Sequence, residues 1–359
     1  MKTIRVNLSA NSYHIHIDKG LLGKIGDILV KEKTPCKTLL ITDKNIEKVY
    51  GGIVTESLKG NKFDVRTVAL KPGEEQKTLE TAGILYDACF EHKLDRNSLI
   101  VALGGGVVGD ISGFVAATFM RGIPFIQIPT SLLAQVDSSI GGKVAVNHPR
   151  GKNMIGSFYQ PKAVFIDTDT LGTLPPPELV AGLVEVVKYG VIRDAELFEY
   201  IESTLDDILQ LNYNALLKII ATSCQIKANV VEEDETEKHL RAILNYGHTI
   251  GHAIETVTRY KKYRHGEAVA IGMLYASRIA IDMGLADNTV FERQLSLIKK
   301  LGLALNSGLP SEDIVKALYA DKKAIGGRLR FILPTKIGEV IISDQVTEEI
   351  LYRILGKPL

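Results

Sequence analysis

At 359 residues, the chain is longer than one hydrophobic core usually fills, so two domains are expected. A composition of 45% hydrophobic and 24% charged residues is typical of a soluble globular protein, and a formal net charge of +1 argues against general nucleic-acid binding. The cysteines Cys36, Cys89 and Cys224 fit neither a disulfide framework nor a Cys-based zinc site. The sequence has no signal-peptide pattern and no apolar run of about 18 residues that could span a membrane. We therefore expect a cytoplasmic protein with no nucleic-acid or membrane partner.

The first half of the chain alternates strand patterns with helix patterns. Residues 3–8 and 13–18 alternate apolar and polar side chains, as two strands of a hairpin would. Apolar or β-branched runs follow at 37–42, 63–70, 98–103, 124–129 and 163–167. Helical stretches such as 78–92 and 110–120 separate several of these runs. Buried strands that alternate with helices predict a parallel sheet covered on both faces.

The pattern changes after three consecutive prolines at 175–177, which no continuing helix tolerates. The apolar residues then recur every three to four positions, as in helices. The only strand-like runs are 328–334 and 338–343, which predict a hairpin near the end. We therefore expect an α/β nucleotide-type domain at 1–172 and a mostly α-helical domain at 173–359. A cleft between two such domains is a usual place for a small-molecule site.

A glycine-rich loop follows the strand at 98–103. Gly104, Gly106 and Gly109 match G-x-G-x-x-G, a spacing that lets backbone N–H groups and a helix N-terminus approach a pyrophosphate. The acidic residue expected about 20 positions later is missing, although Asp43 at the end of an earlier strand could replace it. On these residues alone, nucleotide binding and a plain tight turn explain the loop equally well.

Histidines and a carboxylate predict a metal site in the second half. His248 and His252 lie one helical turn apart, a common metal-binding spacing, and His265 begins the next helical stretch. Glu185 lies among valines, where a carboxylate is costly to bury without a partner. Two histidines and one carboxylate form a common catalytic zinc set. Spacing favours a metal site but leaves its third ligand open.

The alternative is a solvent-facing polar stripe. If the helix extends back to Arg241, the stripe contains Arg241, Asn245, His248, His252 and Glu255. Glycines at 247 and 251 would weaken this helix by roughly 1 kcal/mol each relative to alanine. Glycine beside each histidine suggests that something approaches the helix closely.

Several cations occur beside glycine-rich turns or on apolar helix faces, where lysine and arginine are unusual. They are Arg121, Lys143, Lys152, Lys188, Lys227, Arg241, Lys322 and Lys323. Convergence of several of them would bind a substrate that carries both phosphate and carboxylate.

Four segments together resemble the 3-dehydroquinate synthase family, within the sugar-phosphate cyclases. They are residues 104–122, 129–156, 183–190 and 244–255. The resemblance extends over essentially the whole chain, in order, and the motifs are highly specific in combination. It implies an α/β fold with an N-terminal Rossmann-like NAD-binding domain, a mostly α-helical metal- and substrate-binding domain, an active site in the interdomain cleft, and a homodimer.

The resemblance also implies a role for each candidate residue. Zn²⁺ (or Co²⁺) would be held by Glu185, His248 and His265, which makes His252 an active-site residue and not a ligand. NAD would lie on Asp43, Asn45, Glu74, Lys77, Gly105, Gly106, Val107, Asp110, Thr130, Ser131, Leu133, Thr173 and Leu174. Catalysis and substrate binding would fall to Arg121, Asp137, Lys143, Lys152, Asn153, Lys188, Lys227, Arg241, Asn245, His252 and one of Lys322 and Lys323. Ser131 stands where the family often has threonine, and the hydroxyl is kept.

The implied reaction converts the small-molecule sugar phosphate 3-deoxy-D-arabino-heptulosonate 7-phosphate to 3-dehydroquinate and phosphate, in the shikimate pathway of aromatic amino acid biosynthesis. It proceeds by transient oxidation by NAD, β-elimination of phosphate, re-reduction and aldol closure, so the enzyme is a lyase. Three alternatives remain. One is a sibling cyclase of the 2-epi-5-epi-valiolone or 2-deoxy-scyllo-inosose synthase type, the second a metal-dependent polyol dehydrogenase, and the third a non-catalytic nucleotide-binding regulator.

Overall fold

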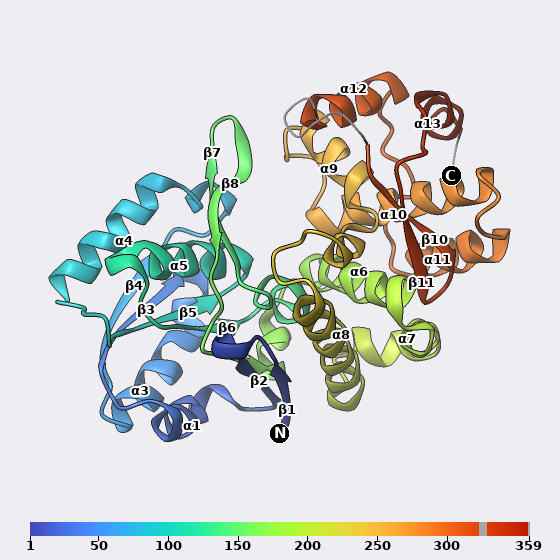
Figure 1. The fold of residues 1–359 in the computed structure, drawn as a ribbon. Helices are drawn as coiled ribbons and strands as arrows, with labels where there is room; N and C mark the ends of the chain where they lie inside the picture. The colour runs from blue at the N-terminus through green and yellow to red at the C-terminus, as the bar shows by residue number, and fades with distance from the viewer. Residues whose placement is uncertain (323–328, 358–359) are drawn as a thin grey trace. The chain divides into compact units, whose positions relative to one another are not determined.

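This computed structural model describes residues 1–322 and 329–357 (Figure 1). Internal contacts divide the chain into two compact units. Unit 1 comprises Met1–Leu179 and Leu211–Thr236, and unit 2 comprises Val180–Gln210 and Glu237–Leu359. Within the described residues, no helix is long and apolar enough to cross a membrane.

Unit 1 is built on a seven-stranded sheet with the order β1-β2-β9-β6-β5-β3-β4. Only β1 runs antiparallel to its neighbour, and the other pairs are parallel. The strands are β1 (Lys2–Val6), β2 (Tyr13–Asp18), β3 (Lys37–Asp43), β4 (Asp64–Leu70), β5 (Leu99–Gly104), β6 (Phe125–Pro129) and β9 (Ala163–Asp167). The predicted N-terminal hairpin and parallel sheet are therefore confirmed.

Helices cover both faces of this sheet. Consecutive side chains of a strand point to opposite faces, and the apolar side chains on each face are buried by helices. Leu40 packs in one buried cluster with α1 (Ile25–Glu32) and α3 (Gly52–Gly60). Leu39 and Ile41 pack in the other cluster, with α4 (Leu79–Glu91) and α5 (Gly106–Thr118). Figure 1 shows the two helix pairs on opposite sides of the sheet. The α/β class expected from the sequence is the observed one.

Two parts of unit 1 differ from the sequence-based expectation. An antiparallel hairpin of β7 (Lys143–His148) and β8 (Gly151–Phe158) extends beside α5 and was not predicted. Helix α8 (Tyr213–Glu233), which periodicity placed with the second domain, packs against β1 and the π-helical segment Ala134–Ser138. Helical periodicity identifies a helix but carries no information about which core its apolar face enters.

Unit 2 is mostly helical and is centred on α10 (His265–Asp282), whose residues are largely buried. Helix α10 contacts α9 (His248–Val257), α11 (Asn288–Lys300), α13 (Glu348–Leu355) and the strand β10 (Phe331–Lys336). The remaining elements are α6 (Pro176–Arg193, in unit 2 from Val180), α7 (Ala195–Leu209), α12 (Ser311–Lys322) and β11 (Glu339–Ser343). Strands β10 and β11 pair antiparallel, which confirms the predicted terminal hairpin.

The glycines beside the histidines explain how α9 packs on α10. Gly247 has a left-handed φ of +79°, which ends the 3₁₀ segment Leu240–Asn245 and lets α9 begin at His248. A Cβ at Gly251 would lie 3.2 Å from backbone atoms of α10, so glycine permits the close approach. The close neighbour predicted from these glycines is a helix. The single polar stripe running back to Arg241 does not form, because the helix starts seven residues later.

Candidate active site

A metal-type cluster lies within unit 2, where α6, α9 and α10 each contribute one side chain. Ligand atoms of Glu185, His248 and His265 lie within 4.8 Å of one another. The Nε2 atom of His248 lies 3.6 Å from Glu185 Oε1, and the Nε2 atom of His265 lies 3.7 Å from the same oxygen. That oxygen is buried and has no hydrogen-bond partner among the described residues. Two imidazole nitrogens and one carboxylate oxygen are the donor set of many catalytic Zn²⁺ sites.

The surroundings of this cluster set its charge. Lys188 lies one turn after Glu185 on α6 and forms an ion pair with its carboxylate. Burial holds the pKa of His248 well below its usual value, and the positive charge of Lys188 adds to this effect. Burial also acts to lower the pKa of His265, but the hydrogen bond with Glu255 and the negative charges of Glu185 and Glu255 raise it overall. His248 is therefore held in the neutral form that binds a metal ion.

His252 lies beside this cluster. Its Nε2 atom is 4.0 Å from Glu255 Oε2, and its ring centroid is 5.3 Å from that of His248. His252, Glu255 and His265 form a second group of potential ligands, but the His252 side chain is 53% exposed. Spacing alone favoured His248 and His252 as a ligand pair. In the structure His248 and His265 approach the same oxygen, Glu185 Oε1, and His252 lies beside Glu255 instead.

A cavity of about 420 Å³ opens beside the histidines within unit 2. Asn245, His248 and His252 line it, together with Glu237 and Arg330. Asn245 donates its side-chain amide to Glu237 Oε1 at 2.9 Å. Arg241, on the same 3₁₀ segment as Asn245, is 1% exposed. Lys323 lies outside the described residues, and so does the side chain of Lys322, so their predicted role stays a prediction.

The residues expected to bind NAD lie in unit 1, at the carboxyl ends of parallel strands. Asp43 ends β3, Gly105 follows β5 and Thr130 follows β6. Thr173 and Leu174 come shortly after β9, and the Thr173 hydroxyl lies 2.7 Å from the Tyr50 hydroxyl. Strand order reverses between β3 and β5, because β4 follows on one side of β3 and β5 lies on the other. Open α/β sheets bind ligands at such a reversal.

The glycine loop forms the N-terminus of α5. Gly105 is the N-cap residue and Gly106 the first helical residue, with Val107 next. In the described part of the chain, no side chain caps this helix, which leaves its first N–H groups for a ligand. The Ser131 side chain is nearby, with its Oγ 3.6 Å from where a Cβ of Gly105 would lie. Leu133 is half-buried in the short helical segment that follows Ser131.

Charged residues from three segments meet beside this loop. Lys77 is 4% exposed and donates to Asp110 Oδ2 at 2.9 Å. Glu74 Oε1 lies 3.6 Å from the Lys77 ammonium and 3.8 Å from that of Lys152 on β8. Burial acts to lower the pKa of Lys77, but the charges of Asp110 and Glu74 raise it overall, so Lys77 stays protonated. The structure thus brings three predicted cofactor residues together, and one of them, Glu74, lies beside the predicted substrate residue Lys152.

Asn147 connects Glu74 to Asn153. The sequence motifs did not single it out. Its side-chain amide donates to Glu74 Oε1 at 2.8 Å, and its Oδ1 accepts from the backbone N–H of Asn153 at 3.0 Å. Asn153 itself has a left-handed φ of 57°. Asn147 falls inside the recognised segment 129–156, but only the hairpin of β7 and β8 reveals its contacts. Lys143 is exposed at the start of β7, in the same hairpin.

Lys227 and Asp137 form a second, partly buried ion pair in unit 1. The Lys227 ammonium on α8 forms an ion pair with the Asp137 carboxylate and donates to the Asp137 backbone carbonyl at 2.6 Å. Lys227 is 5% exposed, so its charge is held at a fixed position. The contact explains why an apolar helix face carries this lysine.

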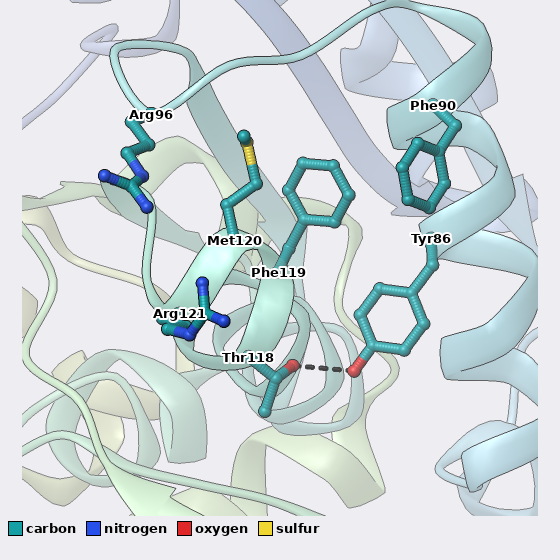
Figure 2. A pocket seen from close by; sticks show the side chains of 7 residues that line it. All are labelled: Tyr86, Phe90, Arg96, Thr118, Phe119, Met120 and Arg121. Atoms are coloured by element: carbon teal, nitrogen blue, oxygen red, sulfur yellow. Dashed lines mark hydrogen bonds between the residues drawn. The ribbon is translucent and has the colours of Figure 1, made fainter.

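Arg121 lies apart from these groups (Figure 2). It follows α5, at the opposite end of that helix from Gly106, about 20 Å away at 1.5 Å per residue. Arg121 lines a cavity of about 560 Å³ together with Tyr86, Phe90, Arg96, Thr118, Phe119 and Met120. The lining has no other predicted site residue from the described chain, and the role of Arg121 stays a prediction.

Known proteins resemble this chain over its length. The family "3-dehydroquinate synthase N-terminal" matches residues 67–181, and "3-dehydroquinate synthase C-terminal" matches residues 182–324. A 3-dehydroquinate synthase of Desulforamulus reducens is 53% identical, over 99% of this chain and 100% of the relative.

Solved structures agree with this relationship. A 2-deoxy-scyllo-inosose synthase complexed with carbaglucose-6-phosphate, NAD⁺ and Co²⁺ is 29% identical, with a TM-score of 0.90 and full coverage (100%) of both chains. A 2-epi-5-epi-valiolone synthase from Streptomyces hygroscopicus with NAD⁺ and Zn²⁺ bound is 26% identical, with a TM-score of 0.89 over 97% of this chain and 96% of the other. Matches over the full length, in sequence and in fold, place this chain in the 3-dehydroquinate synthase family.

Proposed function

We propose that this chain is an NAD- and divalent-metal-dependent lyase that converts 3-deoxy-D-arabino-heptulosonate 7-phosphate to 3-dehydroquinate and phosphate. The observation that carries the proposal is the approach of two imidazoles to one buried carboxylate oxygen, in a chain half identical to 3-dehydroquinate synthases over its whole length. The siting of the reaction between the two domains stays a prediction.

Glu185, His248 and His265 are the proposed metal ligands. A buried carboxylate oxygen without a hydrogen-bond partner among the described residues fits a cation, because burying an uncompensated acceptor is costly. When bound, a divalent metal supplies Lewis-acid chemistry that lowers the pKa of a substrate hydroxyl. Lys188 neutralises part of the Glu185 charge and so limits the net negative charge of the ligand group.

The carboxyl edge of the unit 1 sheet is the proposed NAD site. The backbone N–H groups at the N-terminus of α5, at Gly105 and Gly106, would bind the pyrophosphate. Asp43 would accept a hydrogen bond from a ribose hydroxyl. Bound NAD would supply reversible hydride transfer without being consumed, so the net reaction would be that of a lyase. Lys77 is held by Asp110 and Glu74, which fixes a positive charge beside the glycine loop.

We propose that the charged groups of the substrate bind mainly to lysine and arginine side chains. We assign the phosphate to Lys143, Lys152 and Asn153, which lie on one hairpin, and the carboxylate and hydroxyls to Lys227 and Arg241. Glu74 and Asp137 orient Lys152 and Lys227 before substrate arrives. Charges positioned in advance need no reorganisation as phosphate leaves, and this is usually the largest contribution to catalysis.

The test is a phosphate-release assay with NAD and Zn²⁺ and three substrates. We expect rapid release from the heptulosonate phosphate and little from sedoheptulose 7-phosphate or glucose 6-phosphate, which lack the carboxylate. Preferential turnover of either sugar phosphate would instead identify a sibling cyclase. The proposal also includes a cytoplasmic location and a homodimer, and sedimentation of the purified chain would test the homodimer.

A further inference from the structure

The two ring nitrogens of His248 have separate partners. Nε2 faces Glu185 Oε1, while Nδ1 lies 3.0 Å from the backbone carbonyl oxygen of Tyr246. A carbonyl oxygen can only accept, so this contact places the proton on Nδ1. The lone pair of Nε2 is then directed toward Glu185.

His265 repeats this arrangement with a different partner. Its Nε2 faces the same Glu185 oxygen, and its Nδ1 lies 3.4 Å from Glu255 Oε1. A carboxylate also only accepts, but it carries a full negative charge, unlike the carbonyl at His248. Both imidazoles therefore direct Nε2 toward Glu185 Oε1. Their Nδ1 atoms have different partners, a backbone carbonyl for His248 and a carboxylate for His265.

Glu255 is placed to hold His265 across a helix boundary. It lies in the last turn of α9 and is 6% exposed, whereas His265 is the first residue of α10. Its backbone carbonyl accepts from the N–H of Tyr260 at 2.7 Å, so the chain that leaves α9 is tied to the same residue. First residues of helices lack part of the backbone hydrogen bonding of the interior, so a side-chain contact fixes His265 where the helix does not.

We propose that Glu255 is a positioning residue of the metal site. It holds the proton on Nδ1 of His265 and thereby directs Nε2 to the cation bound by Glu185 and His248. Glu255 is not itself a ligand of that cation, because it faces the opposite nitrogen of the His265 ring. This inference rests on the proposed metal site and adds a determinant of its affinity.

The direct test is Zn²⁺ affinity, measured on the metal-free chain by competition with a chromophoric chelator, without NAD or substrate. Losing a group that orients a ligand typically weakens metal binding about 10- to 100-fold. We expect a loss of that size in Glu255→Leu, with one Zn²⁺ still bound per chain. Glu255→Gln should lose less, because its amide oxygen can still accept the Nδ1 proton.

Asp282→Asn is the matched control. Asp282 ends the helix that His265 begins, about 25 Å away at 1.5 Å per residue, and it accepts from Arg353 Nε at 3.0 Å. This variant removes one negative charge from the same unit and breaks a structural contact. It should change thermal stability but leave Zn²⁺ affinity unaltered. The visible absorption of the Co²⁺ form should shift in Glu255→Leu and not in this control.

The possible outcomes separate the two claims. If the unmodified chain binds no Zn²⁺, the metal site fails and the role of Glu255 fails with it. If the unmodified chain binds Zn²⁺ and both Glu255 variants bind it with the same affinity as the unmodified chain, only the positioning role is overturned. A loss in Glu255→Leu as complete as that in Glu185→Ala would make Glu255 a ligand, which also contradicts the assignment.

Discussion

Lys188 and Glu185 form an ion pair one turn apart on α6, in surroundings where neither side chain is more than 1% exposed. Removing one partner of a buried ion pair typically costs about 3–5 kcal/mol, because the other charge is left uncompensated. In this protein a metal ion at Glu185 would supply a second compensating charge.

We therefore predict that Lys188→Met lowers the free energy of unfolding by about 3–5 kcal/mol in the metal-free chain and by less in the presence of Zn²⁺. Urea denaturation with and without the metal measures both values. The double variant Lys188→Met, Glu185→Gln is the control and should recover part of the loss without metal. An identical deficit with and without Zn²⁺ would argue against a cation at Glu185.

Asp43 allows cofactor binding to be separated from folding. Its Oδ1 caps the helix after β3 by accepting from the backbone N–H groups of Asn45 at 2.8 Å and Ile46 at 3.2 Å. Asparagine also caps helices well, so Asp43→Asn should leave stability unchanged but weaken NAD binding about 10- to 100-fold, the effect of losing a hydrogen bond to a charged group.

Asp43→Ala should weaken NAD binding similarly and also lower stability by about 1 kcal/mol, because it removes the cap. Titration of NAD by calorimetry and thermal denaturation of each variant give the two quantities. Unchanged NAD affinity in both variants would remove Asp43 from the proposed cofactor site.

Gly272 lies where α10 meets the start of α9. A Cβ at this position would overlap the backbone carbonyl oxygen of Gly247, the residue immediately before His248. Gly272→Ala should therefore destabilise unit 2 by about 1–3 kcal/mol and weaken Zn²⁺ binding, because α9 must move. Gly52→Ala, on a helix with open space at that position, is the control and should change neither property. Normal Zn²⁺ affinity in Gly272→Ala would show that this packing does not position His248.

His16 predicts a pH dependence of stability. Burial lowers the pKa of His16, an effect that nearby Glu32 opposes. Its ring stacks on Phe165 with centroids 5.2 Å apart. Because the folded pKa lies below the unfolded value of about 6.5, the unfolded chain binds the proton more readily, so stability is fully present above that pH and falls as the pH is lowered through it.

His16→Gln should make stability less dependent on pH between about 7.5 and 5.5, the range on either side of the unfolded pKa. Denaturation curves at several pH values test this. The neighbouring residue His14 is 43% exposed on its side chain and lowers the pKa of His16 less than burial does, so His14→Gln should retain most of the dependence of the unmodified chain. An equal effect of both substitutions would exclude burial of His16 as the cause.

Local patterns were sufficient for much of the fold. The apolar run at 37–42 predicts β3, and its alternation explains why Leu39 and Leu40 enter different buried clusters. The hairpin of β7 and β8 was missed because β8 contains Gly151 and Gly156 and is largely exposed, so that apolar alternation marks only Val144 and Val146 in the short strand β7. The place of α8 in unit 1 depends on contacts with distant segments, about which the periodicity of the sequence carries no information.

The candidate metal site shows the same division. Spacing singled out His248 and His252, whereas the grouping of His248 with His265 followed from family resemblance. The reason is that His265 reaches Glu185 through the close packing of α10 on α6, where Gly266 lies against the backbone of Ala181, a contact that glycine permits but does not specify. Glu255 appeared in the sequence only as part of a polar stripe, and its contact with His265 Nδ1 appears only in the folded chain.

One measurement tests the catalytic account most directly: simultaneous recording of phosphate release and NADH absorbance during turnover of the heptulosonate phosphate with NAD and Zn²⁺. We expect one phosphate per substrate consumed and no net NADH, because the hydride is returned in each cycle. Net accumulation of one NADH per substrate, without phosphate, would contradict the lyase assignment and identify a polyol dehydrogenase.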